Sequence, residues 1–252
     1  MVYPKIIGSQ IIRLTSVDST NNFVLGSMAG ESYPEGTIVM AIEQFAGQGL
    51  EHNKWESEKG KNLTFSVVLY PVFLQPAEQF MLNKAVSLAI ADVVREYLPT
   101  GPVRVKWPND VYIRDNKVAG ILINNTIRGN HFDHSIVGIG MNVNQRKFLS
   151  DAPNPVSLNN YLNETTDLEE CLHKLSSSLN FRYNQLRMGK KDQLDDEYLE
   201  NLYRLGKSTE FRVGKELFHA RIQGVSEYGQ LILQKESGET AKYEFKEVEF
   251  VI

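Results

Sequence analysis

The strongest constraint on the fold is a series of short segments that are too continuously apolar for either side to face water. Five of them have the length and composition of β-strands: residues 37–43, 62–70, 103–107, 117–123 and 135–139. Between them, residues 81–98 place apolar side chains at helical spacing, and Pro99 and Gly101 end that pattern. The sequence therefore predicts an α/β fold of the α+β type, with a mixed sheet and helices packed on it.

Local signals refine this outline. Arg114 to Lys117 joins two strands through Asp115 and Asn116, residues that tolerate tight turns, so we expect a hairpin there. Thr166 and Glu169 form the pattern of a capping box before a helix with leucines on one face. A further helix is expected over residues 192–205.

The pattern changes after Gly206. Short segments typical of strands follow at residues 210–213, 217–225, 230–234 and 240–245, with glycines between them. We therefore expect two domains, a large one over residues 1–206 and a small all-β one over residues 207–252.

Charge and composition exclude several classes of protein. The 27 basic and 31 acidic residues give a formal net charge of −4, so no global field attracts nucleic acid or an anionic membrane. No apolar run approaches the roughly 20 residues that span a bilayer, and residues 1–10 lack the apolar stretch of a signal peptide. With Cys171 as the single cysteine, these features lead us to expect a cytoplasmic protein without a disulfide.

Two segments carry residues suited to chemistry. Residues 44–66 read QFAGQGLEHNKWESEKGKNLTFS, in which Gly47 and Gly49 allow a close approach of the backbone to a ligand, although an ordinary turn is the more common reason for such a glycine pair. Residues 103–110 read VRVKWPND and place Lys106 near a strand end, where its ammonium can stabilise developing negative charge. A lysine in a salt bridge beside a buried tryptophan is the structural alternative.

The order of these motifs resembles the biotin–protein ligase family. Residues 19–21 (STN), the loop from Gly47 to Trp55, KWPND at 106–110, KVAGIL at 117–122 and GIGMNV at 138–143 follow one another as in that family. The resemblance spans about residues 14–145, and the C-terminal segment resembles the family's SH3-like domain, for which we expect a small β-barrel. It implies a ligase that activates biotin with ATP as biotinyl-5'-AMP and transfers it to a lysine.

The resemblance also implies which residues contact biotin. Ser19, Thr20 and Asn21 would hydrogen-bond the ureido ring, because a buried ring with donors and acceptors needs matched partners. Helix capping is the alternative role for Ser19 or Thr20. The remaining biotin contacts implied are Gln44, Gln48, Gly49, Leu50, Lys106 and Gly120.

On the nucleotide side, the resemblance assigns Gly47, Trp55, Lys106, Asn109 and Asn142 to ATP and the adenylate. Lys106 would be the catalytic residue, contacting first the carboxylate and then the adenylate. Asp110 could orient or deprotonate the acceptor lysine, although a structural role is more common for such a residue. We expect Mg²⁺ to arrive with the nucleotide rather than at a cluster of protein ligands, and we interpret His131 and His134 as surface residues.

The glycine loop departs from the family pattern. Family members commonly have GRGRxGRxW there, whereas this chain has GQGLEHNKW, with Gln48, Leu50 and Asn53 in place of arginines. Arginine binds phosphate through two parallel hydrogen bonds, which Gln48, Leu50 and Asn53 cannot form. We therefore expect weaker retention of the adenylate, unless Lys59, Lys61 or Lys117 compensates.

Other functions remain open at this stage. A lipoate or octanoyl transferase has a related fold, and a biotin-sensing regulator or a catalytically dead relative would share the binding residues. The expected partner is a biotin carboxyl carrier domain of a carboxylase, and the resemblance allows a homodimer. Because the first strand, at residues 10–14, begins so early, we expect no DNA-binding domain and no nucleic-acid partner.

Overall fold

The computed structural model describes residues 4–28, 30–50, 53–150 and 152–251. Two of the segments discussed above are described only in part. The described residues do not include residues 1–3, from the segment considered for a signal peptide, or Glu51 and His52, from the glycine loop. No helix within the described residues is long and apolar enough to cross a membrane.

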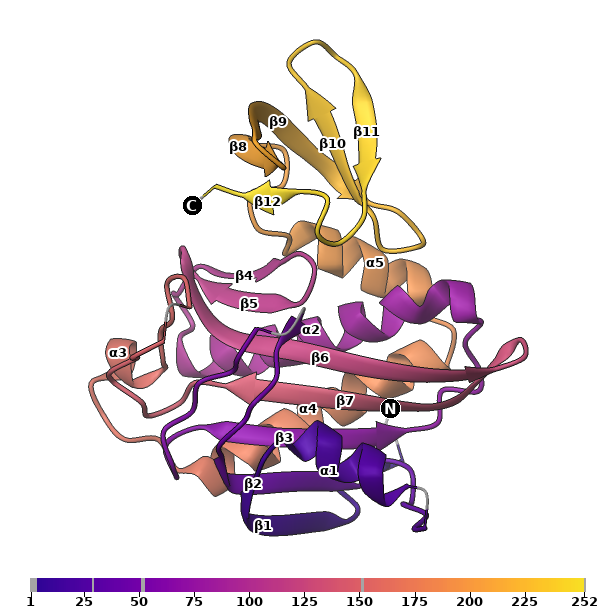
Figure 1. Ribbon diagram of the computed structural model, residues 1–252, viewed down its shortest axis with the longest axis vertical. Coiled ribbons are helices and arrows are strands. Elements are labelled where there is room, and N and C mark those ends of the chain that lie inside the picture. Colours follow the sequence, from indigo (N-terminus) through magenta and orange to yellow (C-terminus); the bar gives the residue numbers. More distant parts are fainter. Residues whose placement is uncertain (1–3, 29, 51–52, 151, 252) are drawn as a thin grey trace.

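A seven-stranded mixed sheet forms the centre of the molecule, in the order β1-β2-β3-β7-β6-β5-β4 (Figure 1). β1 and β2 are parallel, and the other neighbours are antiparallel. The strands are β1 (Ile11–Val17), β2 (Ile38–Gln44), β3 (Leu63–Leu69), β4 (Val103–Lys106), β5 (Asp110–Ile113), β6 (Asn116–Arg128) and β7 (His131–Met141). The predicted mixed sheet and the hairpin at Arg114–Asp115 are confirmed, and β6 and β7 are longer than expected.

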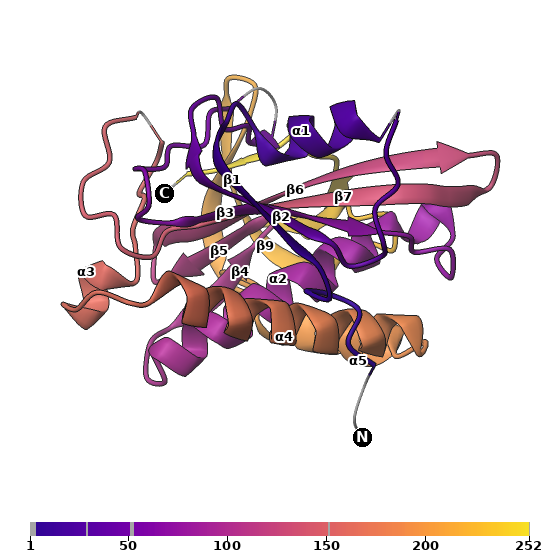
Figure 2. The same cartoon turned by 90° about the horizontal axis from the view of Figure 1, so that it is seen from below.

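Helices cover both faces of this sheet. Figure 2 shows α1 (Thr20–Ser27) on one face, and α2 (Gln79–Tyr97), α4 (Leu168–Arg187) and α5 (Lys191–Glu200) on the other. The short helices η2 (Pro76–Glu78) and α3 (Asn159–Leu162) lie in connections. The expected helix at residues 81–98 is confirmed as α2, whereas α5 ends before residue 205 because turns begin at Asn201.

The inner strand β3 is fully buried, and its alternation separates the two layers. Leu63, Phe65 and Val67 belong to the main apolar core with α2 and α4. Thr64 and Ser66 take the opposite face, since successive side chains of a strand point to opposite sides. A buried polar strip therefore lies beneath α1.

The predicted capping box at Thr166 is wrong. Asp167 is the N-cap of α4, and its side chain accepts hydrogen bonds from the backbone N–H groups of Glu169 and Glu170. A carboxylate one residue later in the chain reaches these N–H groups and also suits the positive end of the helix dipole. The backbone of Thr166 instead exchanges hydrogen bonds with the side chain of Asn144.

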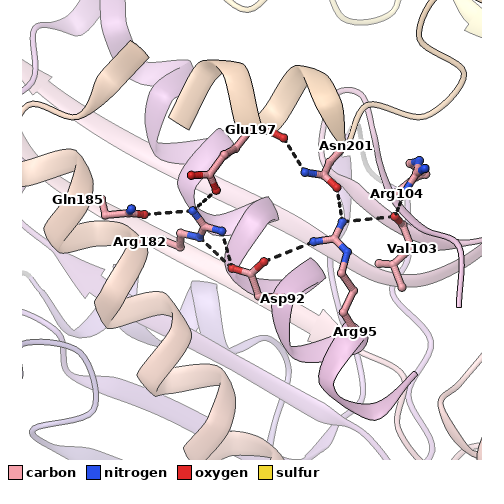
Figure 3. Close-up of polar contacts among 8 residues, drawn as sticks. All are labelled: Asp92, Arg95, Val103, Arg104, Arg182, Gln185, Glu197 and Asn201. Carbon is pink, nitrogen blue, oxygen red and sulfur yellow. Dashed lines mark hydrogen bonds and ion pairs between the residues drawn. The ribbon is translucent and has the colours of Figure 1, made fainter. Parts of the chain in front are cut away.

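An ionic network joins the helices to the end of β4 (Figure 3). Arg182 on α4 bonds Asp92 on α2 at 2.8 Å and also pairs with Glu197 on α5. Just beyond α5, the backbone oxygen of Asn201 accepts a hydrogen bond from the N–H of Val105 at 2.9 Å. The network thus supports the strand residue that precedes Lys106.

Residues after 207 form a second, antiparallel sheet in the order β11-β10-β9-β8-β12. Its strands are β8 (Ser208–Val213), β9 (Glu216–Val225), β10 (Leu231–Lys235), β11 (Thr240–Tyr243) and β12 (Glu249–Phe250). The all-β character of this segment is confirmed, but β12 was not predicted. Within the described residues β11 and β12 remain at the two edges, so no closed barrel forms.

The second sheet lies directly over the end of β4 (Figure 1). The indole Nε1 of Trp107 donates a 2.8 Å hydrogen bond to the backbone oxygen of Gly229, and the Trp107 ring packs edge-on against Phe245 at 5.3 Å. The KWPND segment therefore connects the two sheets.

Candidate active site

A cavity of about 520 Å³ opens on the face of the large sheet that carries α1. Its walls come from the start of α1, the glycine loop, the KWPND segment and the C-terminal sheet. Among the predicted site residues, those that line it are Ser19, Thr20, Asn21, Gln44, Gln48, Gly49, Leu50, Trp55, Lys106, Asn109 and Gly120. Ser19 and Gly120, which are 101 positions apart in the chain, thus meet in one cavity.

The floor of the cavity is a row of paired residues across five strands. Thr64 pairs with Gly140, Gly140 with Gly120, Gly120 with Asp110, and Asp110 with Lys106. Directly paired residues share a face of the sheet, and all five line the cavity. The sheet itself therefore connects the polar strip of β3 with Lys106.

Buried hydrogen-bonding groups form the end of the cavity under α1. The Ser66 hydroxyl lies 2.8 Å from Thr20 Oγ1 and 2.5 Å from Asn21 Oδ1. Asn21 Nδ2 donates to the Leu122 backbone oxygen and to Asn124 Oδ1. Polar groups held this firmly suit a small ligand that carries both donors and acceptors.

Gln44 belongs to the same network, because its Oε1 accepts hydrogen bonds from the backbone N–H and the hydroxyl of Thr20. Ser19 combines both roles that the sequence left open. Its hydroxyl caps α1 by accepting from the Asn22 N–H at 3.5 Å, and the residue also lines the cavity.

The two described sides of the glycine loop, residues 47–50 and 53–55, pair with each other along the cavity wall. Trp55 N donates to Gly47 O at 2.9 Å, and Gly49 N donates to Asn53 O at 2.7 Å. Gly47 does not itself line the cavity. A Cβ there would lie 2.6 Å from both Gln44 Nε2 and the Trp55 backbone oxygen, so glycine allows the loop to pack against the cavity wall.

Trp55 lies on the glycine floor. A Cβ at Gly140 would come within 2.6 Å of the indole Nε1, and a Cβ at Gly120 within 3.1 Å of the ring. The ammonium of Lys117 lies 5.6 Å from the ring centre. The buried indole Nε1 has no hydrogen-bond partner among the described residues, so it is available to a ligand.

Lys106 lies at the far end of the floor in an apolar setting. Its ammonium is 4.6 Å from the Phe250 ring centre and 5.4 Å from that of Tyr112. Burial lowers the pKa of Lys106, and Asp110 opposes that shift. A partly desolvated cation of this kind interacts strongly with an anionic ligand.

The neighbours of Lys106 are held by the strands. Asn109 Nδ2 donates to the Ile121 backbone oxygen at 2.6 Å, which fixes the segment after Pro108 against β6. Asp110 forms an ion pair with Lys117 at 2.7 Å. Lys117 therefore brings charge to the cavity but already has a carboxylate partner.

Several other predicted residues lie elsewhere. The Asn142 side chain donates to the Val156 backbone oxygen and does not line the cavity, and neither do Lys59 and Lys61. Lys59 pairs with Glu43. His131 is exposed, as expected, whereas His134 is half-buried and contacts Asp133.

Sequence reasoning missed two groups of cavity residues. Thr64, which lines the cavity, carried a usable signal, because Thr64 and Ser66 are polar residues two positions apart in an otherwise apolar strand and so mark one polar face. Residues of the C-terminal sheet also reach the cavity, and their local sequence gave no comparable signal: Phe245, Lys246, Val248, Glu249 and Phe250.

Comparisons with known proteins agree with this geometry. The family model described as the biotin/lipoate A/B protein ligase family matches residues 14–142. The biotin–[acetyl-CoA-carboxylase] ligase of Paracoccus denitrificans is 31% identical over 240 residues, which cover 89% of this chain and 94% of the relative. The solved biotin protein ligase of Aquifex aeolicus in complex with biotin and ATP has a TM-score of 0.80 at 25% identity, covering 96% of this chain and 100% of that chain.

A longer relative matches over a shorter region. The bifunctional ligase/repressor BirA of Escherichia coli is 35% identical over 140 residues, which cover 56% of this chain and 42% of the relative, so the match spans less than half of that protein. The family match nevertheless includes just over half of the 252 residues, and the Paracoccus relative matches over nearly its whole length. The chain therefore belongs to the biotin/lipoate A/B protein ligase family.

Proposed function

We propose that the chain is an ATP-dependent biotin–protein ligase, which forms biotinyl-5'-AMP and transfers biotin to a lysine of a biotin carboxyl carrier domain. The observation that carries this proposal is the single cavity that joins the hydrogen-bonding groups of Thr20 and Asn21, held from below by Ser66, to the ammonium of Lys106. Relatives named as biotin ligases and a relative solved with biotin and ATP support it.

In the first step, a carboxylate oxygen of biotin attacks the α-phosphorus of ATP, and diphosphate leaves. The groups around Asn21 hold the ureido ring, the backbone of Gln48, Gly49 and Leu50 covers the acyl chain, and Lys106 stabilises the negative charge that develops on the phosphoryl group. We assign Trp55 and Asn109 to the nucleotide, with Mg²⁺ bound to its phosphates. Gly47 and Asn142 then act indirectly, because they support the residues that line the cavity.

In the second step, the amine of the carrier lysine attacks the carbonyl carbon of the mixed anhydride. An amide forms, AMP leaves, and the amine gives up a proton. Asp110 lies beside Lys106 on the floor, and its ion pair with Lys117 favours a role in holding Lys117 and Trp55 in place over one as the base.

The proposal extends to the arrangement of the chain and its surroundings. We infer a domain boundary at residues 206–207, an SH3-like ancestry for the C-terminal sheet, and a cytoplasmic setting. A homodimer is part of the proposal because β6 pairs with β5 only as far as Gly120, which leaves the rest of its edge open to a second sheet. Sedimentation with and without biotin and ATP tests the dimer, and a monomer under both conditions would contradict it.

The function is tested by incubating the purified protein with Mg-ATP, biotin and an apo carrier domain, and then measuring the mass of the carrier. We expect a gain of one biotinyl group, which the folded variant Lys106→Ala loses. Lipoate and octanoate are run in parallel. A gain only with one of those acids would move the chain to the lipoyl branch of its family, and no gain with any acid would favour a binding protein or an inactive relative.

A further inference from the structure

The segment that follows β7 forms part of the cavity wall at Pro153. Among its described residues, 146–150 and 152–154, none is buried, and the Leu149 side chain is 91% exposed. Apolar packing therefore contributes little to the position of this segment. Its place beside the cavity must come from hydrogen bonds.

The carboxylate of Glu56 accepts several of these bonds. Oε1 accepts from the Leu149 N–H and from the Gln145 side-chain amide, both at 2.9 Å, and Oε2 accepts from the Leu149 N–H at 3.0 Å and the Ser150 N–H at 2.7 Å. Burial raises the pKa of Glu56, but the hydrogen bonds from Ser150, Leu149 and Gln145 outweigh this effect and lower it below its ordinary value. The group is therefore ionised near neutral pH, and hydrogen bonds to an ionised acceptor are stronger than neutral ones.

The buried side chain of Gln145 ties Glu56 to the large sheet. Gln145 is 2% exposed, and its Oε1 accepts from the Glu58 N–H at 2.9 Å and from Asn62 Nδ2 at 2.6 Å. Asn62 Oδ1 in turn accepts from the Val143 N–H at 3.0 Å. Because Asn62 precedes β3 and Val143 follows β7, Glu56 is anchored where these two paired strands end.

Trp55 connects Glu56 to the cavity. It directly precedes Glu56 in the chain, and its indole lies on the glycine floor described above. At the other end of the segment, the Lys117 N–H donates to Asn154 O at 2.7 Å, and the Lys117 ammonium lies 5.6 Å from the centre of the indole ring. Glu56 and Lys117 thus hold the segment on either side of Pro153 in the chain, and both adjoin Trp55.

We propose that Glu56 is a positioning residue for nucleotide binding: it ties the segment that carries Pro153 to the chain directly after Trp55, and so holds the indole and that part of the wall in one arrangement. The assignment of this end of the cavity to ATP rests on the proposed function. Glu56 itself does not line the cavity, so it acts through Trp55 and Pro153 and not by contact with the ligand.

The variant Glu56→Ala removes the carboxylate. We expect trypsin to cleave after Lys147 about 10-fold faster than in wild type, because the segment opens more often and the Lys147 backbone oxygen is bonded to the same Gln145 amide at 2.9 Å. Acrylamide should quench more of the tryptophan fluorescence, since Trp55 gains exposure while the other tryptophan, Trp107, stays buried. The KM for ATP should rise about 5- to 10-fold, and the KM for biotin less than about twofold.

Glu58→Ala is the matched control. Glu58 lies two residues further along the chain, is exposed, and its carboxylate has no hydrogen bond or ion pair within the described part of the chain. Its N–H donates to Gln145, and alanine keeps that group. This variant should leave cleavage, quenching and both KM values unchanged. Glu56→Gln should behave like Glu56→Ala although it keeps the size of the side chain, because its NH2 group would face N–H donors.

Cleavage and quenching are measured without substrates, which keeps this inference separate from the proposed function. If the wild-type protein fails to biotinylate a carrier, the proposed function falls, while these two measurements still test the anchoring by Glu56. Equal cleavage after Lys147 in wild type and Glu56→Ala, relative to cleavage after the exposed Lys215 in the β8–β9 turn, would overturn that anchoring. Faster cleavage with an unchanged KM for ATP would overturn the role in nucleotide binding. Loss of the cooperative thermal transition in both Glu56 variants would also overturn it, because Glu56 would then support the fold as a whole.

Discussion

Two glycines on β7 allow the two ends of the cavity to be tested separately. Gly138 lies beneath Asn21, where an added Cβ would be 2.6 Å from Oδ1 and 2.7 Å from Nδ2. Gly140 lies beneath Trp55, where a Cβ would be 2.6 Å from the indole Nε1. Alanine at either position must displace the side chain above it, because real Cβ contacts are not that short.

The expected magnitude follows from the hydrogen bonds of Asn21. Its amide donates to Leu122 O at 3.2 Å and to Asn124 Oδ1 at 3.0 Å, so it cannot move without leaving buried polar groups unpaired. Such a loss costs about 1–3 kcal/mol, which corresponds to an increase of about 5- to 150-fold in the KM for biotin of Gly138→Ala. The KM for ATP should rise much less.

Gly140→Ala should show the opposite selectivity. The indole of Trp55 would lift from the floor, so the KM for ATP should rise more than that for biotin. Steady-state kinetics with each substrate varied in turn measure both effects. Gly26→Ala is the control, because this glycine lies in α1 with open space around its Cβ position.

Equal effects of Gly138→Ala on both substrates, in a variant that remains folded, would refute the assignment of the α1 end to biotin. The reverse pattern would mean that the ligand lies the other way round in the cavity. Loss of the cooperative thermal transition would show a general disturbance of the sheet, and the argument from these two contacts would then be wrong.

The remaining predictions concern charge and stability. Because burial lowers the pKa of Lys106, this lysine should lose its positive charge at a lower pH than an ordinary lysine. A plot of kcat/KM for ATP against pH should therefore fall on the alkaline side below pH 10.5, and Lys106→Arg should remove that fall. Asp167→Ala should lower the free energy of unfolding by about 1 kcal/mol in urea titrations, whereas Thr166→Val should change it by less than about 0.5 kcal/mol. Arg182→Met should lower the free energy of unfolding by about 3 kcal/mol at neutral pH, because it leaves the charge of Asp92 unpaired. The loss should be smaller in acid, where protonation removes that charge, and burial already raises the pKa of Asp92. An equal loss of stability at both pH values would contradict the pairing of Arg182 with Asp92. A shallow alkaline fall in kcat/KM that persists in Lys106→Arg would assign that fall to another group.

The sequence predicted the strands and helices of the large sheet because their signals are local. The apolar run of β3 and the helical spacing of α2 depend only on neighbours in the chain, and KWPND is specific enough to identify the residue at the end of β4. The error at Thr166 has the same origin, since two adjacent residues competed for one cap and Asp167 had the better geometry.

Residues that the sequence missed depend on long-range contacts. Phe250 and Lys246 reach the cavity only because Trp107 bonds Gly229 and packs against Phe245, and no local pattern encodes that docking. Strand β12, with two residues, is too short to show periodicity. Lys117 was recognised as a cation, but its pairing with Asp110 follows from the register of β5 and β6.

The paired floor from Thr64 to Lys106 also sets a length. Five neighbouring strands span four intervals of about 4.8 Å, which gives about 19 Å between the outer residues. This distance is set by the number of strands and their spacing, so side-chain substitutions cannot alter it. Acids shorter or longer than the preferred substrate would present their carboxylate at a different strand of the floor even if they filled the polar end equally well, so selectivity for chain length should appear in kcat more than in binding.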